Sequence, residues 1–555
     1  MDERTRARFS RRSVLGFMGT GAIAVAAPGA LSACSSSGGG SAPAATGPIS
    51  AADLARILPA YQPLDLVQPD IPGVDGSTPG FTTMPARLVK SVAATPGKGG
   101  TYTVMSPAWW TPPPGLGSNT FYQAVNEQLG ATLDFQVADG NTYGDKLQAV
   151  LASPKDIADW VVMPSWNIPP RFGQGVGKLF TDLTDFLAGD KIKKYPNLAN
   201  IPTDAWKYSA FNGRIYALPY PGELIGNAIF HRRDIFEQLG LQPPTTPEEY
   251  IAVAKAATDP AAGRWGSEDV WNGAQFIFNA STDWYVQGGK LVSRFETDGY
   301  REAVAWLRQL FESGAVHPDA VAGNTQNAKD RFEAGQTLLT FDGLGGWEEA
   351  LTRVRPSNPS YDQQPLDFFA PAGQEPRIPK GAPAGIFSFL KRTDDTARIE
   401  EMLAIADFCA APFGTEEYQL VRYGVEGEHF TRDAAGAPTL NAKGQTEVTS
   451  TYEFLVSPPI VNATVQFPDM VRDLTDWMAR MSTFSVEPVF YGQQIQDPAQ
   501  YSSLGKPFDD LVKDIARGRE DLDALDEAVK TWRSSGGDEL RAYREKFLTG
   551  DETEI

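Results

Sequence analysis

The side chains that most often carry out catalysis are scarce in this chain. Its 555 residues include only two cysteines and three histidines, and His231, His317 and His429 are widely spaced. Transition-metal chemistry needs clustered His and Cys ligands, so this spacing favours hydrogen-bonded structural histidines. We also find no GxSxG, HExxH, Walker, GxGxxG or EF-hand pattern. We therefore expect no catalytic residues, no metal site and no cofactor.

Carboxylates are abundant, but their number is uninformative. With 69 Asp and Glu residues, two carboxyl groups reach the separation that glycosidases use by chance alone. The formal charge of −20 has a clearer meaning, because an acidic surface repels phosphate groups. Nucleic acids and anionic membrane surfaces are therefore poor candidates as partners.

Cys34 ends the segment "RFSRRSVLGFMGTGAIAVAAPGALSAC", in which arginines precede an apolar run and a small-residue site. This is the layout of a secretory signal, and Arg11-Arg12 resembles a twin-arginine (Tat) export signal. "LSAC" resembles a bacterial lipobox, which predicts removal of residues 1–33 and lipidation of Cys34. The alternative is an uncleaved membrane anchor over residues 14–33. Cys409 lies in a helical pattern and is expected to be a buried small hydrophobe.

Tryptophans recur where predicted strands end or loops begin. Ligands of open α/β sheets bind beyond the carboxyl ends of the strands, and an aromatic face can stack on the C–H face of a sugar ring. For each residue, packing in the core is an equally good explanation. The candidates for lining a ligand cleft are Trp109, Trp110, Trp166, Trp271, Trp284 and Trp347.

The elements that must position these residues alternate between strands and helices. Strands are predicted over 100–109, 131–139 and 157–166, with helices between them, which indicates a parallel α/β topology. Helices are also predicted after Thr246, as an N-cap followed by Pro247, and over 298–313. The C-terminal third is mainly helical, and residues 34–99 indicate a flexible tether and a loosely ordered N-terminal arm.

Several stretches resemble one family, the family 1 extracellular solute-binding lipoproteins of bacterial carbohydrate ABC importers. They include "AWKYSAFNGRIYALPY", "NAIFHRRDIFEQLGLQPPTTPEEY", "YREAVAWLRQLFESGAVHPDA", "RFEAGQTLLTF" and "YGVEGEHFT". They follow the family's order from about residue 100 to the C-terminus. The branch that they resemble most comprises the oligosaccharide receptors of the alginate and aldouronate type.

The resemblance implies an α/β, two-lobed periplasmic-binding-protein-like fold (type II) with a ligand cleft between the lobes and a largely helical C-terminal part. Lobe one would comprise 100–218 and about 335–400; lobe two would comprise 219–334 and about 401–555. Tyr220-Pro221 would lie at the first crossing between the lobes. Closure of the lobes over the ligand would create the form that the permease recognises.

The resemblance also completes the set of expected site residues. Some relatives hold calcium after the helix that is "PEEYIAVAKAA" here, but "TDPAAGRWGS" offers Asp259 as its only carboxylate, so we expect no calcium there. A uronate ligand would need basic groups, for which Arg171, Arg232 and Arg233 are candidates by position. The remaining candidate ligand-binding residues are Tyr143, Tyr220, Asp342 and Glu426.

The resemblance predicts a monomeric, non-enzymatic receptor, tethered to the outer face of the membrane by Cys34, that captures an oligosaccharide and delivers it to the permease subunits of an ABC importer. Two alternatives remain open. One is a surface-tethered glycoside hydrolase or lyase, which would share an aromatic cleft but turn its ligand over. The other is a receptor for a peptide or another small polar ligand, or one that signals to a sensor.

Overall fold

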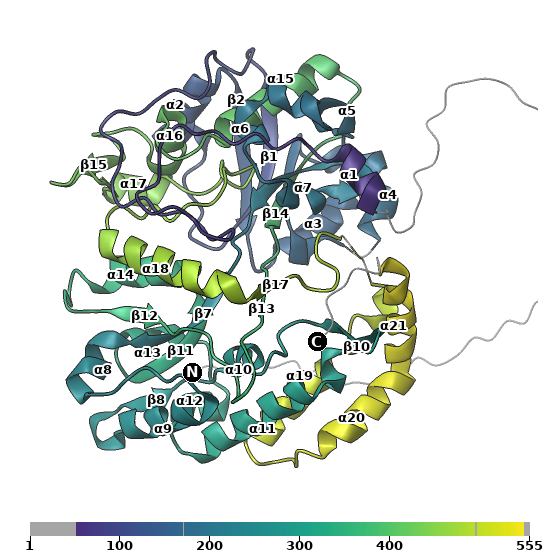
Figure 1. Ribbon diagram of the computed structural model, residues 1–555. Helices are drawn as coiled ribbons and strands as arrows, with labels where there is room; N and C mark the ends of the chain where they lie inside the picture. The colour runs from purple at the N-terminus through teal and green to yellow at the C-terminus, as the bar shows by residue number, and fades with distance from the viewer. Residues whose placement is uncertain (1–50, 170, 494, 496, 549–555) are drawn as a thin grey trace, which may run out of the picture. The chain divides into compact units, whose positions relative to one another are not determined.

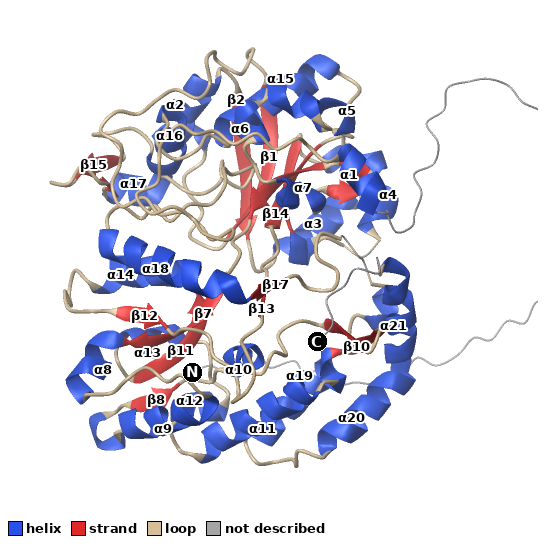
Figure 2. Cartoon of the chain, in the orientation of Figure 1, coloured by secondary structure: helices blue, strands red, loops and turns tan. Residues whose placement is uncertain are grey.

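The computed structural model describes residues 51–548 apart from 170, 494 and 496. The predicted signal peptide, Cys34 and most of the tether lie outside this range. The described residues build two main sheets, of five and four strands, each flanked by helices, together with four two-stranded sheets (Figures 1 and 2). None of the described helices is both long and apolar enough to span a bilayer.

The first sheet has five strands. The three strands nearest the N-terminus are parallel to one another, as the sequence predicts. The strand over residues 384–390 is antiparallel to both of its neighbours. In spatial order the strands are β2 (Thr132–Asp139), β1 (Thr101–Ala108), β3 (Trp160–Pro164), β14 (Ala384–Leu390) and β6 (Ala217–Pro221).

Local sequence signals explain the helices of this first lobe. In α2 (Thr120–Leu129) the Asn119 side chain accepts a hydrogen bond from the Tyr122 N–H at 2.9 Å, and Gly130 ends the helix with a φ of 63°. Other helices that pack in the same core are α3 (Tyr143–Leu151), α4 (Phe172–Leu179), α6 (Pro196–Ala199), α7 (Thr203–Lys207), α15 (Thr396–Cys409) and α16 (Glu416–Tyr423). Cys409 is buried there as a free thiol, as predicted.

The second sheet has four strands. In spatial order they are β12 (Gln363–Pro365), β7 (Asn227–Arg232), β11 (Thr337–Gly343) and β8 (Trp265–Ser267). Only the β11–β8 pair is parallel. The hairpin of β9 (Trp284–Gln287) and β10 (Lys290–Ser293) lies outside this sheet.

Helices cover the second sheet, and two of them confirm the predicted Thr246 cap and the helix predicted over 298–313. Thr246 caps α9 (Pro247–Ala257), and α11 (Asp298–Glu312) buries Val304 and Leu307. The other helices of this lobe are α8 (Arg233–Leu239), α10 (Trp271–Ile277), α12 (Pro318–Ala322), α13 (Ala328–Glu333), α14 (Gly345–Val354), α18 (Pro468–Met481), α19 (Lys506–Ala516), α20 (Ala524–Trp532) and α21 (Asp538–Arg544).

The lobes exchange segments at different residues from those expected. The expected return to lobe one near residue 335 is too early, because β11 pairs with β7 and β8 in the second sheet. The return occurs at β14, which pairs with β3 and β6. Residues 401–456 were expected in lobe two, but α15 and Val456 belong to the core of the first lobe. Periodicity predicts that these elements exist but not which core they join.

Three segments connect the lobes: 222–226, 380–383 and 457–467. The first two run side by side, since the Gly222 N–H donates to the Pro383 carbonyl at 2.8 Å and the Gly381 N–H to the Leu224 carbonyl at 2.9 Å. A Cβ on Gly222 would collide with the Ala382 carbonyl oxygen. Glycine is therefore required here by the close approach of the two backbones.

We expect Gly222→Ala to force these two crossing segments apart and to lower the free energy of unfolding by about 1–3 kcal/mol, as overpacking generally does. Gly226→Ala is the matched control, because a Cβ at Gly226 would meet open space. Thermal unfolding of both variants checks this prediction. An equal melting temperature for the two would contradict the close approach described here.

The N-terminal arm is more firmly held than the sequence suggests. After α1 (Ala51–Ile57) it has little regular structure, but the Phe81 N–H donates to the Asn462 carbonyl at 2.8 Å and the Asn462 N–H to the Pro79 carbonyl at 2.9 Å. Further on, the buried Glu417 carboxylate accepts from the Val92 N–H at 3.1 Å. The expectation of a loosely ordered arm is therefore wrong for these residues.

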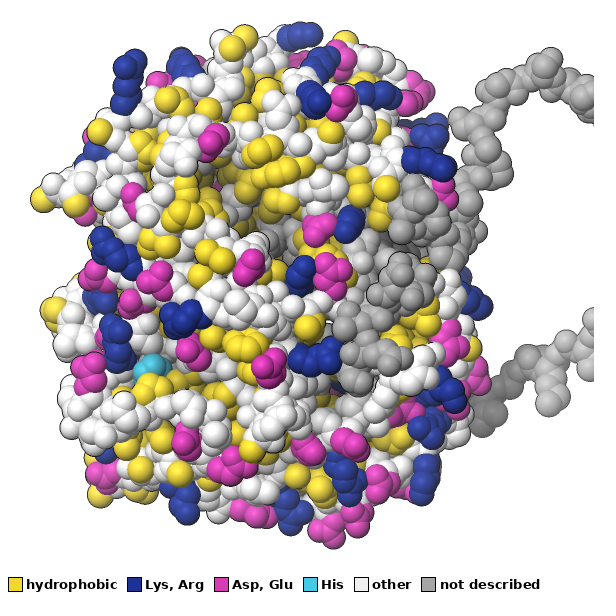
Figure 3. All heavy atoms as spheres, viewed as in Figure 1, with side chains coloured by type: hydrophobic (Ala, Val, Ile, Leu, Met, Phe, Trp, Pro, Cys, Tyr) yellow, Lys and Arg dark blue, Asp and Glu magenta, His cyan; other side chains and the backbone are white. Residues whose placement is uncertain are grey.

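Acidic and basic side chains are interspersed on the face that Figure 3 shows. Exposed ion pairs within the described chain include Arg301 with Asp523 at 2.8 Å and with Asp526 at 2.9 Å. Exposed pairs of this kind each contribute little to stability. The net acidity of the chain is thus spread over the visible surface rather than gathered in one patch.

Candidate functional site

An aromatic cluster lies at the carboxyl ends of strands β1 and β3. Trp109 and Trp166, which follow these two strands, have ring centroids 5.9 Å apart. Phe454 joins them, with its ring 6.0 Å from that of Trp109, 5.6 Å from that of Trp110 and 6.0 Å from that of Tyr220. Strands β1 and β3 are parallel, so both end at the same edge of the sheet. Residues that are distant in sequence therefore meet there.

The cluster presents aromatic faces to solvent. Trp166 is 64% exposed and Trp109 is 41% exposed, although large apolar side chains usually become buried. An exposed tilted pair of indoles offers stacking surfaces for the apolar face of a ligand. Of the residues predicted from sequence, Trp109, Trp110, Trp166 and Tyr220 are brought together here.

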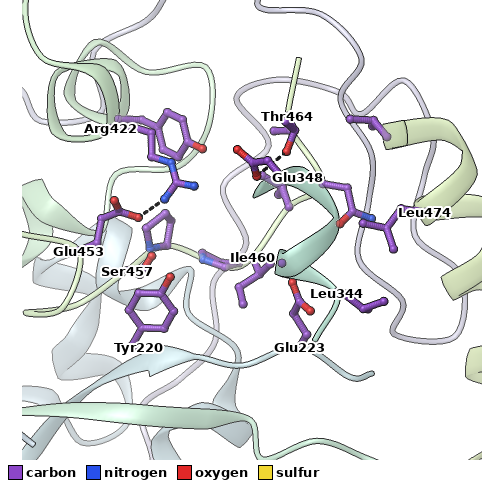
Figure 4. A pocket seen from close by; sticks show the side chains of 18 of the residues that line it. Tyr220, Glu223, Leu344, Glu348, Arg422, Glu453, Ser457, Ile460, Thr464 and Leu474 are labelled. Atoms are coloured by element: carbon purple, nitrogen blue, oxygen red, sulfur yellow. Dashed lines mark hydrogen bonds and ion pairs between the residues drawn. The ribbon is translucent and has the colours of Figure 1, made fainter. Parts of the chain in front are cut away.

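A cavity of about 280 Å³ adjoins the cluster through Tyr220, which lines both. Its walls come from the two lobes and from their connections (Figure 4). The contributing segments are β6, the crossing at Glu223, the start of α14, helix α16, residues 453–464 and helix α18. The cavity therefore lies where relative movement of the lobes would change its shape.

Two polar pairs are built into the cavity wall, as Figure 4 shows. Arg422 forms an ion pair with Glu453, and the Thr464 hydroxyl donates to the Glu348 carboxylate at 2.9 Å. The Glu453 carboxylate raises the pKa of Arg422 well above its ordinary value, so the guanidinium stays charged. These pairs give the wall fixed donors and acceptors for a polar ligand.

Glu223 lies on the crossing segment itself, and its carboxyl points toward the other side chains in Figure 4. Within the described part of the chain, no hydrogen bond or ion pair to this carboxyl is found. Burial raises its pKa to about 7. The cavity therefore contains one carboxyl group that is available to a ligand.

Several residues predicted to line the cleft belong to the core instead. Trp347 is 1% exposed and packs against Phe230 with ring centroids 5.9 Å apart. Its position follows from the phase of α14, because Gly345 and Glu348 line the cavity while Trp347 points to the other side of the helix. The expectation for Trp347 is wrong for this structure.

Trp284 and Trp271 also pack in the core of the second lobe. Trp284 is 8% exposed and lies near Trp532, with ring centroids 6.3 Å apart. Trp271 begins α10 and is half-buried against the edge of Tyr300 at 5.5 Å. The sequence predictions placed both residues in loops, whereas Trp271 begins α10 and Trp284 begins β9, and each side chain turns inward onto a helix that is distant in sequence.

Tyr143 and Arg232 are buried and fully engaged. The Tyr143 hydroxyl donates to the Val162 carbonyl at 2.7 Å, which ties α3 to the sheet. Arg232 is 3% exposed, pairs with Asp234 at 2.8 Å, and stacks on Tyr361 at 4.4 Å. Neither side chain lines the cavity, so the prediction that they bind ligand is wrong and both have structural roles.

The remaining predicted residues lie away from the cavity wall. Asp342, at the end of β11, is half-buried and accepts from the Gly343 N–H at 2.8 Å. Glu426 is exposed and pairs with Arg432 at 3.0 Å. At the position where some relatives hold calcium, Asp259 accepts from the Ala262 N–H at 3.3 Å, and the described residues contain no cluster of three or more potential metal ligands.

Sequence reasoning missed Glu223, Phe454 and the Arg422–Glu453 pair. No motif surrounds them, and three of the four come from segments that meet β6 only in the folded chain. The stretch "YGVEGEHFT" begins at Tyr423, which also lines the cavity. This stretch was the one local signal that pointed to the right region.

The fold and the site define a class of binding protein whose two lobes enclose a ligand. A family model for bacterial extracellular solute-binding proteins matches residues 115–405, more than half of the chain. The chain therefore belongs to this family, and its fold is the two-lobed fold of periplasmic solute-binding proteins.

Individual relatives are distant. The chain is 24% identical to the polygalacturonan/rhamnogalacturonan-binding protein YtcQ of Bacillus subtilis, over 65% of this chain and 75% of that protein. It is 22% identical to the lipoprotein LipO of the same organism, over 75% of this chain and 86% of that protein. The structure of the Streptococcus pneumoniae substrate-binding protein FusA in complex with kestose matches with a TM-score of 0.59 at 18% identity, covering 80% of this chain and 98% of the other.

Proposed function

We propose that this protein is an extracytoplasmic receptor that captures a carbohydrate, an oligosaccharide in particular, and delivers it to the permease of an ABC importer. The observation that carries this proposal is the exposed aromatic cluster beside a polar cavity whose walls come from both lobes. Indole faces stack on sugar rings, and the carboxylates and hydroxyls of the wall bind sugar hydroxyls. YtcQ is named as a binder of polygalacturonan and rhamnogalacturonan, and FusA was solved in complex with kestose, so both relatives support a saccharide ligand.

Binding and closure are linked in this proposal. A ligand that contacts the first lobe at Trp109 and Trp166 and the second lobe at α14 gains its full set of contacts only when the lobes come together. The connecting segments, with their close approach at Gly222, are the elements about which the lobes would rotate. The permease would then recognise the closed form of a monomeric receptor.

One observation favours a different function, a glycoside hydrolase. Glu223 has a pKa raised to about 7 and lies in a cavity with the carboxylates of Glu348 and Glu453. A glycosidase uses a carboxylic acid of raised pKa together with a second carboxylate. Turnover distinguishes this enzyme from a receptor.

A panel of oligosaccharides tests the proposal. We expect one saccharide class to raise the melting temperature without forming new reducing ends. At a ligand concentration of a hundred times Kd, binding adds about 2.7 kcal/mol to the free energy of unfolding. Steady formation of reducing ends would establish the hydrolase. Stabilisation by peptides, with none by any saccharide, would establish the peptide receptor.

We also propose that export by the twin-arginine signal and lipidation of Cys34 hold the receptor at the outer face of the membrane. LipO, a relative, is named as a lipoprotein. We expect Cys34→Ala to release the protein from the membrane fraction, because the diacyl anchor would be lost. Metabolic labelling with a fatty acid and cell fractionation check this. Retention of an unlabelled Cys34→Ala chain would instead support an uncleaved anchor over residues 14–33.

A further inference from the structure

The charges that line the interlobe cavity are unequal. The lining residues include three carboxylates, those of Glu223, Glu348 and Glu453, and one basic side chain, that of Arg422. Arg422 is already paired with Glu453. The wall therefore carries an excess of negative charge in a partly enclosed space, where charge interactions are stronger than in water.

The two other carboxylates differ in how they are held. Glu348 lies in the first turn of α14, where the helix dipole favours a negative charge, and it accepts from Thr464 at 2.9 Å. Glu223 lies at no helix N-terminus and accepts no hydrogen bond in the described chain. A half-buried carboxylate without a partner is less favourable than a paired one, so Glu223 is the group whose environment a bound cation would improve most.

Two of the three basic residues considered for a uronate are committed elsewhere, and the third, Arg171, is exposed and does not line the cavity. Arg232 is buried with Asp234, and Arg233 pairs with both Asp362 and Asp473. Neither lines the cavity. An anionic sugar would therefore meet carboxylates without a free cation to offset them.

We propose that the cavity selects saccharides that carry a protonated amino group, which donates to the Glu223 carboxylate, and that it discriminates against uronic acids. This inference rests on the proposed function and names the ligand class of that same site. This ligand class differs from that of YtcQ, which is named as a binder of galacturonans.

Proton uptake and release give this inference a second readout. Because burial raises the pKa of Glu223 to about 7, much of the unliganded protein carries a protonated Glu223 at pH 6.5–7. An ammonium group beside it stabilises the carboxylate and lowers that pKa, so an amine that is already protonated in solution makes Glu223 release its proton to solvent on binding. The titratable and charged groups that share the cavity wall with Glu223 are Tyr220, Glu348, Tyr418, Arg422, Tyr423 and Glu453.

The test is a calorimetric comparison of β-1,4-linked tetrasaccharides of glucose, glucosamine, N-acetylglucosamine and mannuronate, each at pH 6.5 in two buffers of different ionisation enthalpy. We expect the glucosamine tetramer to bind at least about tenfold more tightly than the neutral pair, as charge-assisted hydrogen bonds do, and with proton release. The uronate should bind most weakly. Glu223→Gln should remove the preference for the amine, so that this variant binds the glucosamine and glucose tetramers with equal affinity.

The control variant is Glu527→Gln, which removes one carboxylate from an exposed pair with Lys530 in α20 and should keep the preference intact. Equal binding of glucose and glucosamine tetramers, or preference for the uronate, overturns the inference while the proposed function stands. A preference for the amine that persists in Glu223→Gln overturns the role of Glu223. If no saccharide of any charge binds, the proposed function and this inference fall together.

Discussion

Replacing Trp109 and Trp166 together with alanine should weaken saccharide binding by about ten- to a hundredfold. Each stacking contact contributes about 0.5–1.5 kcal/mol beyond area burial, and two lost contacts correspond to this range. Because Trp166 is 64% and Trp109 41% exposed, their removal should change the melting temperature of the free protein little. Titration calorimetry and thermal unfolding on the same preparation measure both quantities.

The control for this double variant is Tyr61→Ala, which removes a 50% exposed aromatic side chain on the N-terminal arm. It should leave affinity and melting temperature unchanged. If the double variant binds the saccharide as the wild type does, the aromatic cluster is not the ligand platform. A large loss of stability in the free double variant would show that the two indoles pack the fold instead.

Trp347→Ala should have the opposite result, with a loss of about 3–5 kcal/mol in the free energy of unfolding of the second lobe. Trp347 is 1% exposed and fills the space between α14 and Phe230 in β7, so alanine would leave a large cavity. Urea denaturation followed by fluorescence and circular dichroism measures the loss. Saccharide affinity, measured under conditions where the variant is folded, should fall much less than in the Trp109/Trp166 variant.

A second substitution separates packing from polar effects at the same position. The indole N–H of Trp347 is buried without an acceptor in the described structure, so Trp347→Phe loses volume but no hydrogen bond and should cost less than Trp347→Ala. If Trp347→Ala were as stable as the wild type but no longer bound saccharide, Trp347 would be a cleft residue and its assignment to the core would be wrong.

Much of the local structure could be predicted from the sequence because its signals are local. The Gly130 stop of α2, the Thr246 cap of α9 and the apolar face of α11 all involve residues within a few positions of one another. The partition between lobes could not be predicted in the same way. Strand β11 joins the second sheet and β14 the first, and pairing over such sequence distances leaves no periodic trace in either strand.

The candidate site shows the same limit. Trp109 and Trp166 were predictable because each directly follows a strand of a parallel pattern, and the carboxyl ends of such strands gather at one edge. Phe454 reaches that edge only because residues after α16 stay in the first lobe instead of passing to the second. Trp347 was misassigned because its inward direction depends on where α14 begins, and a shift of one residue would rotate its side chain by about 100°.

The central claim is that the protein holds one intact saccharide and releases it unchanged. The most direct measurement is a titration with the saccharide that stabilises the protein most, followed by recovery of the ligand and its analysis by mass spectrometry. We predict binding of one saccharide per chain and full recovery of the original chain length after prolonged incubation. Shortened or unsaturated products in excess of the protein would contradict this account and identify an enzyme.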